Sequence, residues 1–195
     1  MINNVTDKII LASKSPRRKQ LLRQIDFDFK VVPSKIEEDL SLKLKPFLFV
    51  EYYANLKAQN VANKYQNSWV IGADTIVVFN ENIFGKPKDK NESYSMLKKL
   101  SGNTHNVFTG ISIHHQNKDI RHTFHEKTIV QFKTLTDNCI SYYINTYNTL
   151  DKAGSYGIQD WLSAFIKRID GCFYNVMGLP LAKFYEEFTT LNELR

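Results

Sequence analysis

One apolar run, Trp69–Phe79, constrains the fold more than any other segment of the sequence. Its β-branched and aromatic residues are typical of a buried strand, yet Asp74 interrupts it shortly after Gly72. Burying a carboxylate costs several kcal/mol unless it is paired or binds a metal. We therefore predict a central strand that carries a functional acid. The alternative is a β-bulge or turn at Gly72, with Asp74 capping a loose backbone group.

The rest of the chain alternates between strand-like and helix-like segments. Before the central run, the pattern predicts strands over Ile9–Ala12 and Phe29–Val32 and helices over Pro16–Ile25 and Pro46–Tyr65. After it, we expect a hairpin turn at Asn80–Asn82 into Ile83-Phe84, helices over Asn91–Leu100 and Thr136–Tyr147, strands over His105–His115 and Thr123–Phe132, a hairpin of Ala164–Ile169 with Cys172–Val176, and a closing helix over Leu179–Leu191. This order predicts an α/β fold with a mixed, twisted sheet and flanking helices.

Length and composition narrow the class of protein. No linker, repeat or low-complexity tract divides the 195 residues, so we expect a single domain over residues 1–195. A hydrophobic content of 43% and a charged content of 24% exclude wholesale disorder. Cys139 and Cys172 form no C-x-x-C pair, which excludes a disulfide framework. With no signal-peptide pattern and no apolar stretch long enough to span a bilayer, we expect a cytoplasmic protein without a membrane partner.

The cations are distributed unevenly between lysine and arginine. The net charge is +6, but the lysines are dispersed, which is typical of a solvated surface and makes nucleic acid an unexpected partner. Arg17 and Arg18 stand together behind Ser15 and Pro16, which suit the N-cap and first position of a helix. Cations there oppose the helix dipole, so the pair indicates a phosphate in front of the helix. The alternative is a surface helix kept soluble by its arginines.

Four further segments carry weaker signals. Ile36–Asp39 is an acidic cluster suited to Mg²⁺ or Mn²⁺, or equally to an exposed loop. Gly85-Lys86-Pro87 places a lysine in a rigid turn that lacks the upstream glycine of a Walker A loop. Leu150–Gln159 contains two glycines three apart, which predicts a loop of close approach, and Asn175–Pro180 leads into the last helix. The histidines show no metalloprotease spacing, and we interpret them as structural or exposed.

In order from Leu11 to Pro180, these segments resemble the Maf family of nucleotide pyrophosphatases. The matching motifs are S-x-S-P-R-R at Ser13–Arg18, I-E-E at Ile36–Glu38, K-A at Lys57-Ala58, G-A-D-T at Gly72–Thr75, G-K-P at Gly85–Pro87, the turn Leu100–Gly102 with Thr109-Gly110, D-K-A-G-x-Y-G-I-Q at Asp151–Gln159, and N-V-x-G-L-P at Asn175–Pro180. The resemblance implies an elongated α/β fold shared with inosine-triphosphate pyrophosphatases, with two lobes around a cleft. It also implies hydrolysis of a nucleoside triphosphate to the monophosphate and pyrophosphate with a divalent metal, Mg²⁺ or Mn²⁺.

The resemblance also implies residue roles. Asp74 is expected to accept the proton of the attacking water and, with Glu38, to bind the metal. The triphosphate is expected to be neutralised by Arg17, Arg18, Lys57 and Lys86, with Ser13 donating from the first loop. A family branch acting on dTTP and UTP carries arginine after S-P, threonine after the aspartate and glutamine in Y-G-I-Q, which match Arg17, Thr75 and Gln159.

Other interpretations remain open at this point. Family members have been associated with cell-division arrest, so a regulator that binds nucleotide or nucleic acid without hydrolysis is one alternative. A pyrophosphatase that removes modified or non-standard nucleotides such as 7-methyl-GTP is another. The chain departs from the family pattern at Asn148 and Thr149, where an acidic residue and proline are usual, and at Asp160, where glycine is frequent. Sequence leaves the oligomeric state open, with a homodimer as one option.

Overall fold

A mixed sheet runs the length of the molecule in the computed structural model, which describes residue 5 and residues 7–193. The strands are β1 (Lys8–Leu11), β2 (Phe29–Val31), β3 (Ser68–Phe79), β4 (Asn82–Phe84), β5 (Thr104–His115), β6 (Ile120–Phe132) and β7 (Ile166–Asp170). Their order is β2-β1-β3-β5-β6-β7, with β4 also paired to β3. β1 lies parallel to β2 and β3, and all other pairs are antiparallel. The predicted α/β class and mixed sheet are confirmed.

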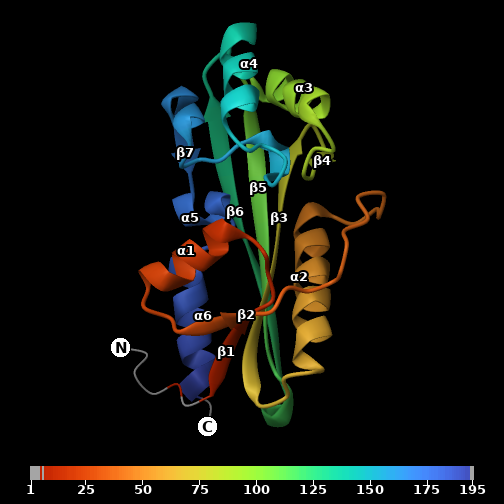
Figure 1. The fold of residues 1–195 in the computed structure, drawn as a ribbon, viewed down its shortest axis with the longest axis vertical. Helices are drawn as coiled ribbons and strands as arrows, with labels where there is room; N and C mark the ends of the chain where they lie inside the picture. The colour runs from red at the N-terminus through yellow and green to blue at the C-terminus, as the bar shows by residue number, and fades with distance from the viewer. Residues whose placement is uncertain (1–4, 6, 194–195) are drawn as a thin grey trace.

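Helices cover both faces of this sheet. They are α1 (Pro16–Gln24), α2 (Pro46–Ala62), α3 (Lys90–Leu100), α4 (Asp137–Thr146), α5 (Phe173–Met177) and α6 (Leu181–Glu193), with short 3₁₀ turns η1 (Gln116–Lys118), η2 (Ala153–Ser155) and η3 (Trp161–Phe165). Figure 1 shows α2 on one side of the long strands and α1 and α6 on the other. Helices α3 and α4 lie at the upper end of the sheet in this view. Among the described residues, no helix combines the length and apolar character needed to cross a membrane.

The alternation of side chains along β3 divides the interior. Ile76 packs with Phe49 of α2 in a cluster beneath that helix. Val77 belongs to the main core on the opposite face. Because successive side chains of a strand point to opposite faces, Asp74 projects towards α2 and Thr75 towards the side of α1. One strand therefore delivers neighbouring polar side chains to two different environments.

Helix α2 lies directly against the backbone of the sheet. A Cβ atom at Gly72 of β3 would lie 2.3 Å from the carbonyl oxygen of Ala54, and one at Gly110 of β5 would lie 2.3 Å from that of Val50. Real Cβ atoms do not approach backbone oxygens this closely, so only glycine allows the contact. The close packing brings side chains of α2 within reach of Asp74.

Part of one edge of β3 has no neighbouring strand. β1 pairs with residues 68–71 of β3, and β4 pairs with residues 77–79. Within the described part of the chain, residues 72–76 pair on that edge with no strand, although β5 covers them on the other edge. One edge of β3 is therefore left without a strand partner at the position of Asp74.

One predicted element is wrong. Cys172–Val176, expected as the second strand of a hairpin, is instead the short helix α5, and its predicted partner strand pairs with β6. Gly178 ends the helix with φ at 110°, and its N–H donates to the carbonyl oxygens of Tyr174 and Asn175. The aromatic and β-branched content of this segment is typical of a strand, but tertiary contacts override that preference. Other boundaries differ by a few residues: α2 ends at Ala62, and β6 begins at Ile120.

We predict that Gly110→Ala destabilises the fold strongly. The added methyl group would meet the backbone of α2, which cannot move aside without pulling the helix off the sheet. The free energy of unfolding should fall by about 3 kcal/mol, as for severe overpacking, in urea titrations. Gly85→Ala is the matched control, because the atoms nearest to its Cβ would all belong to the flexible, exposed side chain of Leu40. A Gly110→Ala variant as stable as this control would show that α2 is free to shift.

Candidate active site

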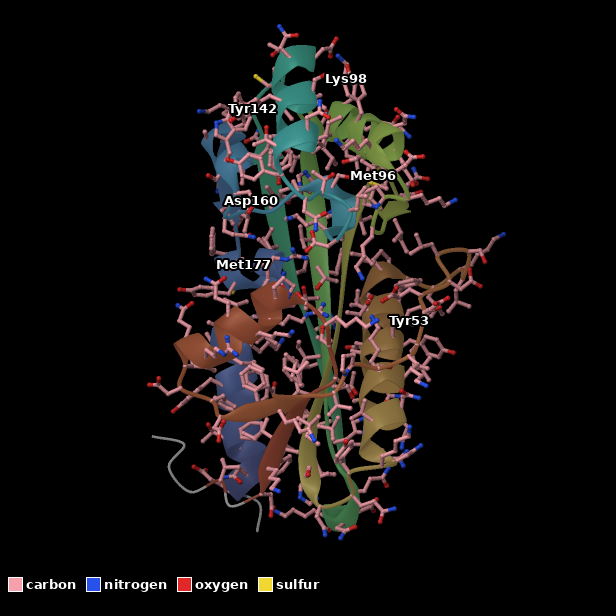
Figure 2. The ribbon with its side chains drawn as sticks, in the orientation of Figure 1. Tyr53, Met96, Lys98, Tyr142, Asp160 and Met177 are labelled. Atoms are coloured by element: carbon pink, nitrogen blue, oxygen red, sulfur yellow. The ribbon has the colours of Figure 1, made fainter. Side chains whose placement is uncertain are left out.

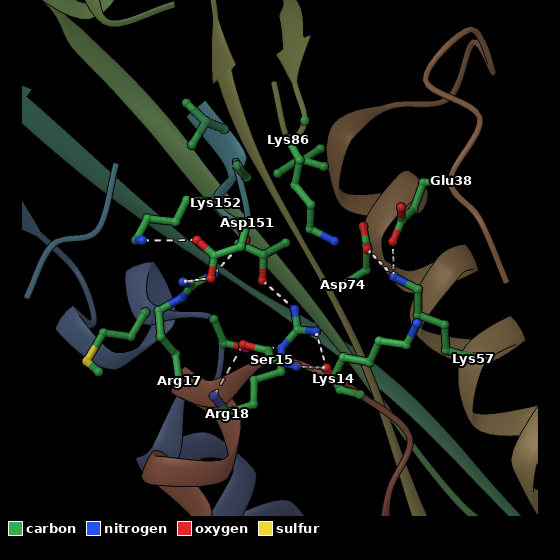
Figure 3. A pocket seen from close by; sticks show the side chains of 18 of the residues that line it. Lys14, Ser15, Arg17, Arg18, Glu38, Lys57, Asp74, Lys86, Asp151 and Lys152 are labelled. Atoms are coloured by element: carbon green, nitrogen blue, oxygen red, sulfur yellow. Dashed lines mark hydrogen bonds and ion pairs between the residues drawn. The ribbon is translucent and has the colours of Figure 1, made fainter. Parts of the chain in front are cut away.

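A cleft of about 800 Å³ opens at the uncovered edge of β3 (Figure 3). Its lining includes residues 12–18 and 34–38, Phe49 and Lys57 of α2, Gly85-Lys86, residues 150–153 and residues 176–178. The structure brings every site residue inferred from the sequence to this cleft: Ser13, Arg17, Arg18, Glu38, Lys57, Asp74, Thr75, Lys86 and Gln159. Segments far apart in sequence therefore meet where one edge of β3 has no neighbouring strand.

Asp74 is the most buried acid of the cleft, with 4% of its surface exposed. Its Oδ1 accepts a hydrogen bond of 2.6 Å from Lys57 Nζ, which reaches across from α2. Its Oδ2 is buried and has no hydrogen-bond partner among the described residues. A buried carboxylate oxygen left unpaired is costly. This atom is therefore suited to a ligand, a water or a metal ion.

Lys57 also binds the second acid of the site. Its Nζ donates to Glu38 Oε1 as well as to Asp74, so one ammonium joins both carboxylates (Figure 3). The loop that carries Glu38 is fixed to α2, because the N–H of Asp39 donates to Tyr53 Oη at 2.7 Å; Figure 2 labels Tyr53 on that helix. Burial raises the pKa of Glu38, but Lys57, aided by Lys86, outweighs it and holds the pKa below its ordinary value.

The two carboxylates fit a divalent cation of the kind that substrate phosphates help to bind. No group of three or more His, Cys, Asp or Glu side chains that could hold a metal occurs in residues 5 and 7–193. Mg²⁺, however, is commonly held by one or two carboxylates together with waters and substrate phosphates. Asp74 with its unpaired Oδ2 and the adjacent Glu38 supply such a donor set.

Arg18 is bound by the protein itself, a role that the sequence did not indicate. Its Nε donates to Gly178 O at 2.8 Å, and Nη1 donates to Ser13 Oγ at 3.1 Å and to Ala73 O at 3.0 Å. Nη2 donates to Thr75 Oγ1 at 2.9 Å. Of the five N–H groups of a guanidinium, one on Nη2 is left for a ligand. Burial lowers the pKa of Arg18 to about 10, which leaves it charged at neutral pH.

Hydroxyl groups extend this network. Thr75 Oγ1 lies 3.0 Å from Thr109 Oγ1, and Thr109 donates in turn to Asn175 O at 3.0 Å. Since Thr109 uses its hydrogen there, Thr75 donates to Thr109. Ser13 Oγ accepts from Arg18 and from the N–H of Ser15, so its own hydrogen is available to the cleft.

The remaining predicted residues differ in how they are held. Arg17 donates from Nη1 to Asp151 Oδ2 and from Nη2 to Asp151 O, each at 2.9 Å. Lys86 and Gln159 are exposed in the cleft, and neither side chain forms a hydrogen bond within the described residues. Lys86 Nζ extends into the space between Asp74 and Arg18 in Figure 3. These two side chains are free to meet a ligand.

Two charged residues that bind each other in the cleft were not identified as site residues from the sequence. Asp151 and Lys152 line it, and Lys152 Nζ lies 3.0 Å from Asp151 Oδ1. The signal available was their place at the start of the motif Asp151–Gln159, whose Gly154 has φ at 65° and packs against Val77. The pairing of Asp151 with Arg17 joins residues 134 positions apart and has no local signature.

Comparison with known proteins identifies the family of the chain. The family model described as Maf-like protein matches residues 8–191. A dTTP/UTP pyrophosphatase of Thermosipho africanus is 46% identical over 92% of this chain and 91% of its own length, and one of Ruminiclostridium cellulolyticum is 46% identical over 95% and 96%. The solved structure of protein VC0702 from Vibrio cholerae superposes at a TM-score of 0.35 and 10% identity, over 72% of this chain and 73% of that one, too weakly to inform the fold. By its family match and these near-full-length relatives, the chain belongs to the Maf family.

Proposed function

We propose that this chain is a nucleoside triphosphate pyrophosphatase that hydrolyses dTTP and UTP to the nucleoside monophosphate and pyrophosphate. The observation that carries the proposal is the buried, unpaired Oδ2 of Asp74 in a cleft supplied with cations. Relatives named dTTP/UTP pyrophosphatase, 42–46% identical over most of the chain, support the choice of reaction. We further propose that residues 1–195 act as one domain.

The chemistry assigned to Asp74 is proton acceptance. The oxygen of a water molecule forms a bond to the α-phosphorus, the bond from that phosphorus to the bridging oxygen breaks, and pyrophosphate leaves. The proton of the water passes to Asp74 Oδ2, while Lys57 holds Oδ1 and so orients the carboxylate. A divalent cation bound by Asp74 and Glu38, Mg²⁺ or Mn²⁺, would supply charge neutralisation on the phosphates.

Cations of the chain receive the triphosphate. Phosphoryl transfer depends mainly on positioning and electrostatic stabilisation. Of the four cations assigned to the triphosphate, Lys86 is the most available, because its ammonium has no partner among the described residues, and Ser13 can donate its hydroxyl hydrogen. Arg17 has donors left beyond its contacts with Asp151. Arg18 offers one N–H and acts chiefly by shaping the loop that carries Ser13.

A nucleotide-binding regulator without hydrolytic activity fits the site less well. A protein that only binds a triphosphate gains nothing from facing it with an unpaired carboxylate oxygen, because like charges repel. Asp74 therefore favours the enzyme over the binder.

Base preference is assigned to Gln159. Its amide makes no hydrogen bond within the described residues, so a donor and an acceptor are both available in the cleft. Together they match the adjacent carbonyl and imide N–H of uracil or thymine. Cytosine presents an amine and a bare ring nitrogen there, so an amide fixed in the orientation that pairs with uracil would leave polar groups unpaired. Arg17 and Thr75 complete the set assigned to substrate choice.

Asp74→Asn should abolish most turnover without unfolding the chain. The exchange is isosteric, and losing a general base costs roughly 10²–10⁴-fold in rate. The loss is measured as pyrophosphate release from UTP with Mg²⁺ or Mn²⁺. Chelation of the metal by EDTA should abolish the activity of the wild-type chain as well. Asp170→Asn, in an exposed ion pair, is the matched control. Activity of Asp74→Asn within tenfold of wild type would show that another acid accepts the proton of the water, and Glu38 would be tested next.

A panel of nucleoside triphosphates should show UTP and dTTP as good substrates and CTP and the purine nucleotides as poor ones. Rejection by an unpaired polar group reaches about 10⁴-fold, whereas the thymine methyl group changes binding by only about 1–3 kcal/mol. Gln159→Glu should weaken turnover of UTP, because an ionised carboxylate cannot donate to a base carbonyl. Faster release of pyrophosphate from 7-methyl-GTP or dCTP than from UTP, under matched metal conditions, would contradict the assignment.

A further inference from the structure

Asp151 holds Arg17 from across the cleft. Arg17 lies in the first turn of α1, and Asp151 lies in the loop after α4. One amino group of the guanidinium donates to the carboxylate and the other to the backbone carbonyl of the same residue, each at 2.9 Å (Figure 3). A two-point contact fixes the plane of a guanidinium as well as its position. Arg17 is 16% exposed in this arrangement, so little of it moves freely in solvent.

Lys152 braces the other oxygen of Asp151. Its ammonium is 3.0 Å from Asp151 Oδ1, donates to Asn148 O, and lies 3.5 Å from Asp160 Oδ2. The side chain of Lys152 is 8% exposed, and an ammonium so buried needs these acceptors. Burial raises the pKa of Asp151, but the hydrogen bond from Lys152 and the charge of Arg17 outweigh it and hold that pKa below its ordinary value.

The network ends on α4, next to Gln159. Asp160, labelled in Figure 2, follows Gln159 directly, and its Oδ2 accepts a hydrogen bond of 2.9 Å from Tyr143 Oη. Tyr143 Oη accepts in turn from the N–H of Gly157 at 3.0 Å. The loop that carries Gln159 is thereby tied to Lys152 at one end and to α4 at the other. Arg17 and Gln159 thus share one chain of polar contacts.

The contacts leave Arg17 able to bind and Asp151 unable to act as a base. A guanidinium has five N–H donors, and Arg17 uses two on Asp151 and none elsewhere within the described residues. Both carboxylate oxygens of Asp151 already contact cations. Any effect of Asp151 on the reaction must therefore pass through its partners.

We propose that Asp151, braced by Lys152, is a positioning residue that holds Arg17 across the cleft with its remaining N–H donors directed to the substrate. This proposal rests on the proposed function, in which Arg17 binds the nucleoside triphosphate. Asp151 itself touches no substrate in this arrangement. Its contribution is to order the arginine before the substrate arrives.

The test is the steady-state kinetics of UTP hydrolysis by the full chain. Asp151→Ala should raise KM about tenfold and change kcat by less than about threefold, because binding must now order an arginine side chain that keeps only its contact with the backbone carbonyl of residue 151. Asp151→Asn keeps an oxygen for Arg17 as well as the backbone carbonyl, so it should recover most of the loss. Asp170→Ala, which removes an exposed carboxylate beside Arg168, should behave as wild type.

A double-mutant cycle separates positioning from general damage. In an Arg17→Ala background, Asp151→Ala should change KM no further, because there is no guanidinium left to hold. The same rise in KM in both backgrounds, or no rise in the wild-type background, would overturn the proposal. If thermal unfolding shows that Asp151→Ala does not fold, Asp151→Asn in the same cycle decides, since a positioning role requires its smaller effect to vanish without Arg17. Absence of pyrophosphate release by the wild-type chain would instead overturn the proposed function.

Discussion

The architecture of the site depends on Arg18, whose side chain binds the backbone of β3 where no strand pairs with it. Between the ends of β1 and β4, the edge of β3 presents backbone groups that no strand pairs within the described chain. Arg18 donates to the carbonyl oxygen of Ala73 at this edge and to Gly178 O beyond it. Buried carbonyl groups need such partners. Because a guanidinium is narrower than a strand, the carbonyl of Ala73 is bound and the cleft still has room.

The alternation of β3 then divides the chemistry between two sides. Asp74 points to α2, where Lys57 meets it, and Thr75 points to Arg18. Lys57 reaches Asp74 because Gly72 lets the backbone of α2 approach the sheet closely. A larger residue there would push the helix and its lysine away from the acid. The close packing at Gly72 therefore also determines the orientation of Asp74, the proposed proton acceptor.

The sequence predicted the features that depend on local residue types, such as the ends of helices. Ser15 caps α1 by accepting from the N–H of Arg18 at 3.4 Å, and Gly102 follows α3 with φ at 71°, as their residue types indicate. It failed at α5, where strand-like residues form a helix. It also identified the residues of the cleft through family motifs without revealing their partners, because the contact of Arg17 with Asp151 is made only by the fold.

The three residues that depart from the family pattern, Asn148, Thr149 and Asp160, all form polar contacts. Thr149 stands where proline is usual, and its buried hydroxyl lies 2.9 Å from Ser93 Oγ. Asn148 accepts from Lys152 through its backbone oxygen, a contact open to any residue type. Asp160 stands where glycine is frequent, and its carboxylate meets Tyr143 and Lys152. A negative charge added at Asp160 beside the buried ammonium lowers the net charge of that loop and stiffens the segment bearing Gln159. The exchange therefore bears on the rigidity of the base-facing loop, and within the described residues Asp160 forms no hydrogen bond or ion pair with Asp74, Glu38 or Lys57.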